Sequence, residues 1–161
     1  MLIIKPYESR YCDGIVALIT NIQQNEFKVP ITLADQPDLL HIDTFYQVNK
    51  GQFWVALNNA EEVVGTIALI DNNERYGTIR KMFVRADYRG VERGVSGILL
   101  AKLEQKAREN RMNTLYLGTV EKLLGSHKFY RKNGFTEITK DLLPPNYPLM
   151  QVDNMFFKKI L

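Results

Sequence analysis

Apolar residues recur at spacings of three and four in several stretches of the chain, and this spacing predicts amphipathic helices. The clearest stretch follows Gly94, where an apolar stripe is backed by charged side chains on the opposite face. Another helix ends at Asn133-Gly134, a typical helix stop. We expect four helices, within residues 11–22, 31–50, 95–109 and 124–132.

Runs of β-branched and aromatic residues lie between these helices and predict strands. Three consecutive runs are separated only by short polar turns, as in an antiparallel meander. The expected strands are residues 2–6, 52–57, 63–70, 76–84, 114–118, 135–138 and 150–161. From residue 76 onward strands and helices alternate, so the pattern predicts a mixed α/β fold. An edge strand at the C-terminus favours pairing with a second copy, and a homodimer is therefore one expected assembly.

Composition narrows the class of protein. The chain has 161 residues, of which 45% are hydrophobic and 24% charged, as expected for one globular domain spanning residues 1–161. No apolar run is long enough to span a membrane, and the N-terminus lacks a signal-peptide core. Cys12 is the single cysteine, so no internal disulfide forms, and with two histidines no zinc spacing exists. We expect a cytoplasmic protein without a metal.

A turn with two glycines and three arginines joins the third strand of the meander to the clearest helix. It covers residues 84–96. Glycines let backbone N–H groups approach a ligand, the start of the helix adds unpaired N–H groups, and the arginines add positive charge. Such a turn suits an anion such as a pyrophosphate, although a plain tight turn has similar composition.

Two motifs in this order give the chain its resemblance to a known family. The first is Tyr88-Arg89-Gly90 with Gly94, and the second is Phe129-Tyr130-Arg131-Lys132-Asn133-Gly134-Phe135. Together they resemble the GNAT superfamily of N-acetyltransferases. The resemblance implies a central mixed, mostly antiparallel sheet of about six or seven strands flanked by about four helices, with acetyl-coenzyme A as co-substrate.

The resemblance also implies roles for individual residues. Met82, Phe83 and Val84 would lie beside the thioester and pantetheine, and an N–H near Met82 would stabilise the oxyanion. Tyr130 would protonate the departing thiolate, a role that suits a donor neutral at pH 7. The residues expected to hold the pyrophosphate are Arg89, Gly90, Val91, Glu92, Arg93, Gly94, Val95 and Ser96.

The residues of the acceptor side are less specific. The strand at residues 76–84 has no carboxylate, so we assign no general base, and Glu26, Asp43 and Glu62 are expected on the solvated surface. The acceptor walls are expected in residues 26–38 and 142–150. Six carboxylates near these walls would tolerate a cationic amine: Glu26, Asp35, Asp38, Asp43, Asp141 and Asp153.

These observations favour an N-acetyltransferase that acts on a primary amine of a small molecule or protein by direct attack through a tetrahedral intermediate. One alternative is a module of the same fold that binds acetyl-coenzyme A without turnover. Another is a small nucleic-acid-binding domain with a basic patch, although neither nucleic acid nor a membrane is an expected partner. The patch would consist of Arg80, Lys81, Arg85, Arg89 and Arg93.

Overall fold

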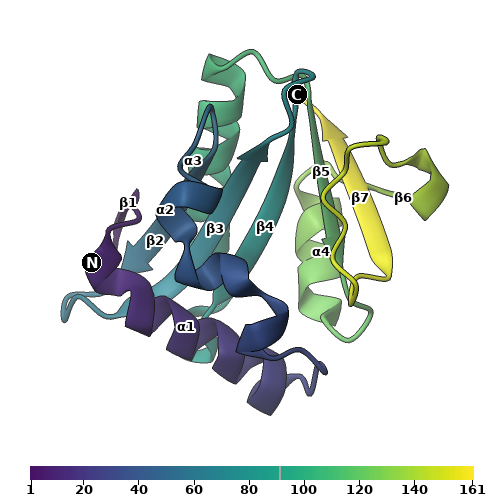
Figure 1. Ribbon diagram of the computed structural model, residues 1–161. Coiled ribbons are helices and arrows are strands. Elements are labelled where there is room, and N and C mark those ends of the chain that lie inside the picture. The colour runs from purple at the N-terminus through teal and green to yellow at the C-terminus, as the bar shows by residue number, and fades with distance from the viewer. Residues whose placement is uncertain (91) are drawn as a thin grey trace.

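The protein is built on one seven-stranded mixed sheet, seen in the computed structural model of Figure 1, which describes residues 1–90 and 92–161. The strand order is β1-β2-β3-β4-β5-β7-β6. The strands are β1 (Ile3–Pro6), β2 (Gln52–Leu57), β3 (Val63–Asp71), β4 (Tyr76–Val84), β5 (Thr114–Thr119), β6 (Thr136–Ile138) and β7 (Met155–Ile160). The expected mixed, mostly antiparallel sheet is confirmed.

Every neighbouring pair is antiparallel except β4 and β5, which run parallel. Their register runs from Tyr76 opposite Thr114 to Ile79 opposite Leu117, which covers only the first half of β4. β7 pairs with β5 on one side and β6 on the other. The expectation of a C-terminal edge strand is therefore wrong, and the reason it gave for a homodimer is lost.

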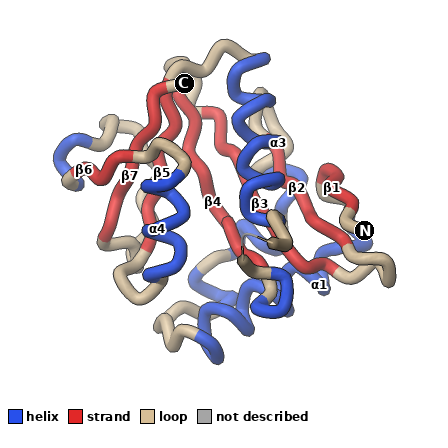
Figure 2. The backbone as a smooth tube through the Cα atoms, turned by 180° about the vertical axis from the view of Figure 1, so that it is seen from behind, coloured by secondary structure: helices blue, strands red, loops and turns tan. Residues whose placement is uncertain are grey.

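Helices cover both faces of the sheet, as Figures 1 and 2 show from opposite sides. The α3 and α4 helices lie on one face, and α1 and α2 lie on the other. The helices are α1 (Cys12–Thr20), α2 (Ile42–Phe45), α3 (Val95–Glu109) and α4 (Leu124–Lys132). Within the described ranges, none of them is long and apolar enough to cross a membrane.

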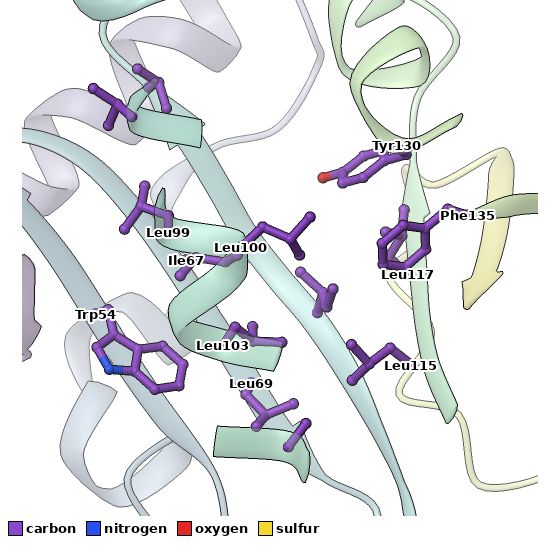
Figure 3. Packing of buried hydrophobic residues seen from close by; sticks show 14 of the residues in the cluster. Trp54, Ile67, Leu69, Leu99, Leu100, Leu103, Leu115, Leu117, Tyr130 and Phe135 are labelled. Carbon is purple, nitrogen blue, oxygen red and sulfur yellow. The ribbon is translucent and has the colours of Figure 1, made fainter. Parts of the chain in front are cut away.

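Alternation along the strands divides the core into two clusters. On β2, Trp54 and Ala56 pack with the α3 side, whereas Phe53, Val55 and Leu57 pack with α1 and α2. Figure 3 shows the α3 leucines, among them Leu99 and Leu103, facing the side chains of the central strands. Successive residues of β2 thus contribute to the cores on opposite faces of the sheet.

Three expected elements differ from the structure. Residues 31–50 form three short turns, Leu33–Asp35, Pro37–Leu40 and α2, in place of one helix. Pro37 starts its own turn, and the Asp38 side chain is buried and bonded to Tyr46, so the segment folds around a polar contact. The first helix continues beyond α1 as a π-helical turn, Asn21–Glu26. The last strand begins at Met155 because a turn precedes it.

Leu103→Ala should lower the free energy of unfolding by about 2–5 kcal/mol, because the Leu103 side chain is fully buried between α3 and the sheet and its loss leaves a cavity. Ile98→Ala on the same helix is the control, since Ile98 is 47% exposed, and it should change stability by less than about 0.5 kcal/mol. Urea unfolding of the two variants measures both values. Equal losses would contradict the assigned packing face of α3.

Candidate functional site

The site begins where β4 leaves β5. After Ile79 no described residue of β5 pairs with β4, while β3 continues to pair with it as far as Val84. Lys81 has a φ of 54° and lies in a bulge of β4, between the residues of β4 that pair with Thr66 and Ala68. The Thr66 hydroxyl donates to the Lys81 carbonyl at 2.6 Å. The bulge and the divergence turn the end of β4 into the wall of an opening.

A cavity of about 700 Å³ occupies the outer part of this opening. The end of β4, the start of α3 and one side of α4 line it. Its lining includes seven of the residues predicted for the coenzyme, namely Met82, Phe83, Val84, Arg89, Gly90, Gly94 and Ser96. The sequence motifs thus meet around one space.

Three predicted residues do not line the cavity with their side chains. Val95 is 1% exposed and packs in the core, so its side chain does not line the cavity. Glu92 and Arg93 are exposed and are not in the lining, and the Arg93 guanidinium lies over the Tyr88 ring at 4.9 Å. The prediction for these three residues concerned their backbone N–H groups, so it stays a prediction. Val91 lies outside the described residues.

Glycines open the wall of the cavity to a ligand. Gly90 and Gly94 have φ values of 106° and 66°, a conformation that glycine adopts without strain. A Cβ at Gly97 or Gly125 would meet nothing within 4 Å, so space lies directly against the backbone there. The N–H groups of Ser96 and Gly97, in the first turn of α3, have no backbone acceptor among the described residues. N–H groups so placed at the start of a helix make this corner of the cavity suited to an anion.

Three cations surround the same corner. The Arg89 guanidinium forms a bidentate ion pair with Glu26 and donates to the Val84 carbonyl at 2.7 Å. Lys128 and Lys132, one helical turn apart on α4, also line the cavity. No role was predicted for these lysines from the sequence. Lys132 lies in the second motif and Lys128 four residues before it, and this spacing is the signal that could have found them.

Tyr130 stands at the inner end of the cavity. It is 5% exposed, and its ring packs edge-on against Phe129 and Phe135. Figure 3 shows its hydroxyl pointing away from Phe135 toward the space beside β4. Burial, and secondarily the Asp153 carboxylate, raise the pKa of Tyr130 above its usual value, so the phenol is neutral at physiological pH.

A second, smaller pocket of about 80 Å³ adjoins the first. The two share Met82, Phe83, Tyr130 and three further lining residues. The second pocket is closed by the end of β5 and by the proline loop, residues 142–150, with Tyr147 and Met150 in its wall. Tyr130 therefore lies at the junction of a large and a small compartment.

The charges of the small pocket differ from expectation. Of the six carboxylates expected near the acceptor walls, only Asp153 lines it. Glu26 is paired with Arg89, Asp38 with Lys81, and Asp35 with the Thr32 backbone. Asp43 and Asp141 are exposed and outside the lining. Most of the six carboxylates therefore serve local contacts or face solvent, and Asp153 is the one that lines this pocket.

Two cations of β4 also line the small pocket. Arg80 donates to the Pro148 carbonyl, which holds the proline loop against β4. The Lys81 ammonium donates to the Gln36 side chain at 2.6 Å and lies 3.5 Å from the Asp38 carboxylate. Burial lowers the pKa of Lys81 despite this carboxylate. Arg80 is thus the cation of the pocket that no carboxylate in the described chain pairs with.

The Asp153 carboxyl has an altered pKa. Burial raises the pKa of Asp153 to about 6, against the opposing effect of Arg80 and Lys81. Within the described ranges, no donor reaches this carboxyl within hydrogen-bonding distance and no ion pair includes it. Sequence reasoning named Asp153 only as one of six acidic neighbours, because nothing local distinguishes it.

Other expected features can be placed as well. Glu62 is exposed near Arg85, and neither it nor Glu26 or Asp43 lines the small pocket. His127 is 5% exposed with Nε2 at 2.8 Å from the Val120 carbonyl, so it is a core residue. The described residues hold no cluster of metal-binding side chains.

The five cations of the nucleic-acid alternative do not form one patch. Lys81 is buried, Arg80 is tied to the proline loop, and Arg89 is paired with Glu26. Arg85 is paired with Asp87, which leaves little free positive charge on a common surface. The arrangement does not favour a phosphate-backbone interface.

Comparison with known proteins points in one direction. The model of the acetyltransferase (GNAT) family matches residues 16–135. An acetyltransferase of the GNAT family from Staphylococcus aureus Mu50 is 37% identical, with a TM-score of 0.96 over 100% of this chain and 99% of that one. The similarity therefore covers the whole chain.

Two further proteins are similar over part of their own length. N-acetylaspartate synthetase of Xenopus tropicalis is 29% identical over 125 residues, which are 75% of this chain and 45% of the synthetase. N-acetylglutamate synthase of Neisseria gonorrhoeae, solved with coenzyme A and N-acetyl-glutamate, has a TM-score of 0.77 at 18% identity, covering 100% of this chain and 35% of that one. This chain thus spans less than half of either protein.

Asp153→Asn should raise the free energy of unfolding at pH 7.5 and leave it nearly unchanged at pH 4. The pKa of Asp153 is about 6 in the folded protein against an ordinary 3.8, so the folded state binds this proton more tightly. The stabilisation is complete below about pH 4 and is lost as the pH rises through about 6. The loss in the wild type is roughly 2–3 kcal/mol.

Urea unfolding at the two pH values tests this expectation. Asp141→Asn is the control, because it removes the same charge from an exposed position, and it should behave like the wild type at both. A destabilised Asp153→Asn at pH 7.5 would mean that the carboxylate is held by favourable contacts.

Proposed function

The chain belongs to the acetyltransferase (GNAT) family, and on that premise we propose that it transfers the acetyl group of acetyl-coenzyme A to the primary amine of a small molecule that also carries an anionic group. The observation that carries the proposal is the position of Tyr130, whose side chain lines both the large cavity and the small pocket. A group transferred between two bound molecules has to pass such a junction.

The large cavity suits the coenzyme. Its volume of about 700 Å³ lies within the range of cofactor sites. Coenzyme A carries phosphate groups, and the free N–H groups of Ser96 and Gly97, with Lys128 and Lys132, provide donors and positive charge for them. The thioester would then lie near Met82, where β4 no longer pairs with β5. This arrangement supports acetyl-coenzyme A as the acetyl donor.

The small pocket suits the acceptor. Its volume of about 80 Å³ and its proline-loop wall favour a small molecule over a protein segment. Arg80, which has no carboxylate partner in the described chain, offers a site for an anionic group of the acceptor. Two similar proteins are named after acetylated amino acids with acidic side chains, namely N-acetylaspartate synthetase and N-acetylglutamate synthase. These names agree with an acceptor that carries an anionic group.

The proposed chemistry uses few groups of the protein. The acceptor nitrogen attacks the acetyl carbonyl directly, and a backbone N–H near Met82 stabilises the oxyanion. Tyr130 donates its phenolic proton to the departing thiolate, which the raised pKa allows because the phenol stays protonated. The alternative is a module that binds the coenzyme without turnover. Such a module would release no thiol, with or without the Tyr130 hydroxyl.

Gly97→Asp should weaken acetyl-coenzyme A binding at least about tenfold, because it adds a carboxylate to the corner proposed for the phosphates. The backbone tolerates the change, since the site is open and an acidic residue suits the first turn of a helix. Calorimetric titration measures the affinity. Ile98→Asp is the control, because it adds the same charge one residue further, outside the cavity lining, and should bind normally. Unchanged affinity of Gly97→Asp would move the phosphate site elsewhere.

Tyr130→Phe should lower kcat for thiol release by about 100-fold or more while leaving acetyl-coenzyme A affinity within about threefold. The ring and its packing are kept, and only the proton donor is lost. The assay measures thiol release with L-aspartate, L-glutamate, glycine, propylamine, putrescine and an alanyl peptide.

We expect L-aspartate or L-glutamate to be acetylated faster than the neutral and cationic amines of this panel. Wild-type activity confined to the peptide would contradict the proposed small acceptor. Coenzyme binding without thiol release for every amine would favour the binding module.

A further inference from the structure

We infer that Asp153 is the general base of the reaction, taking a proton from the ammonium group of the acceptor before the nitrogen attacks. The inference rests on the proposed function. It fills the role that β4 leaves open, because β4 carries no carboxylate along its length. Asp153 comes instead from the turn before β7, on the opposite wall of the small pocket.

The backbone around Asp153 holds the carboxyl in place. The Asp153 N–H donates to the Met150 carbonyl at 3.1 Å, which closes a turn. The next residue, Asn154, donates its N–H to the Thr119 carbonyl at 2.9 Å, and its side chain accepts from the Glu121 N–H at 3.0 Å. The turn is therefore fixed to the end of β5, which is the strand facing β4 across the opening.

Gly118 makes room for this carboxyl. A Cβ at Gly118 would lie 2.4 Å from Asp153 Oδ2 and 3.0 Å from the Tyr147 hydroxyl. Any other residue at this position would displace the carboxyl or the hydroxyl. The end of β5 is thus shaped around the Asp153 side chain.

The Asp153 carboxylate differs from the other sheltered carboxylates in having no partner. Asp38 accepts from Tyr46 and lies beside Lys81, and Glu104 is paired with Lys159. The oxygens of Asp153 make no hydrogen bond or ion pair with any part of the chain that the structure describes. A carboxylate in a pocket that no protein group satisfies is available to a bound ammonium group.

The surroundings suit a base rather than a fixed negative charge. The titratable and charged groups that face Asp153 are Arg80 and Lys81 from β4, Tyr130 from α4, and Tyr147 from the proline loop. Burial outweighs the two cations and raises the pKa of Asp153 to about 6. The carboxyl is therefore mostly ionised at pH 7, and it accepts a proton about 100-fold more readily than an ordinary aspartate.

The proton balance of the step is complete. Of the three ammonium protons, one passes to an Asp153 oxygen and then to solvent, and the nitrogen lone pair forms the C–N bond. The C–S bond breaks with its electron pair on sulfur, which receives the Tyr130 proton. The nitrogen of the tetrahedral intermediate loses its second proton to restore that phenol, and the third proton remains on the amide.

Asp153→Asn provides the test, with acetyl-coenzyme A and the amine panel named above. We expect kcat/KM at pH 7 to fall by about 100-fold or more, with coenzyme affinity within about threefold of wild type. The wild-type profile should fall below about pH 6 and level off above it. The variant should instead gain about tenfold per pH unit toward the pKa of the amine, because only free amine reacts. If Asp153 had only a structural role, the Asp153→Asn variant would keep the pH profile of the wild type.

Two further variants sharpen the result. Gly118→Ala keeps the charge of Asp153 but displaces its carboxyl, and it should lower kcat as well. Asp141→Asn removes a carboxylate from an exposed position nearby and should keep wild-type activity and profile.

An Asp153→Asn variant with wild-type activity and an unchanged acidic limb overturns the inference and leaves the proposed function intact. Wild-type protein that binds the coenzyme but releases no thiol with any amine overturns the proposed function, and the base assignment falls with it. The two failures are therefore distinguishable.

Discussion

The early end of the parallel pairing between β4 and β5 is the constraint on which the site depends. These strands are paired only from Tyr76 to Ile79 on one side and Thr114 to Leu117 on the other. Each is held by its outer neighbour beyond that point, β4 by β3 and β5 by β7. The opening therefore lies between two strand pairs, β3 with β4 and β5 with β7. Both pockets lie in it.

The opening also determines where charge is tolerated. Lys81 at the bulge is buried, but Gln36 and Asp38 satisfy its ammonium group, and this contact ties the short turns of residues 33–40 to the sheet. A buried charge without such partners would be costly. The Asp153 carboxylate has no such partner among the described residues, and its raised pKa reflects the free-energy cost of burying its charge. An unpaired carboxyl in a protein that pairs its other sheltered carboxylates calls for a partner that arrives with the substrate.

Much of the fold could be predicted from the sequence because its signals are local. Runs of β-branched and aromatic residues identified the strands of the meander, the apolar stripe identified α3, and Asn133-Gly134 marked the end of α4. The segment from 31 to 50 failed because its turns are set by Pro37 and by the buried contact of Asp38 with Tyr46. That contact joins the segment to the core, and helical spacing alone does not reveal it.

The residues of the site likewise divide into those that a sequence motif carries and those whose role depends on the folded chain. The loop glycines and Tyr130 were found because motifs carry them, and the structure brings them to one cavity. Lys128 and Lys132 were missed, although Lys132 lies in a motif and Lys128 just before it. Asp153 was not singled out because the residues around it, Arg80, Gly118 and Tyr147, are distant from it or from one another in sequence. Burial and the absence of a partner are properties of the folded chain alone.

The proline loop links recognition of the acceptor to its activation. Arg80 holds the loop through the Pro148 carbonyl, and Asn146 fastens it to the Asn72 carbonyl at 3.0 Å. The same loop places Tyr147 beside Asp153 and runs directly into the turn that carries this carboxyl. A cation for the anionic group and a base for the ammonium group thus stand on facing walls of one small pocket. An acceptor with both groups would span that pocket with its nitrogen directed at Asp153, so the contact that selects the acceptor also orients the atom that reacts.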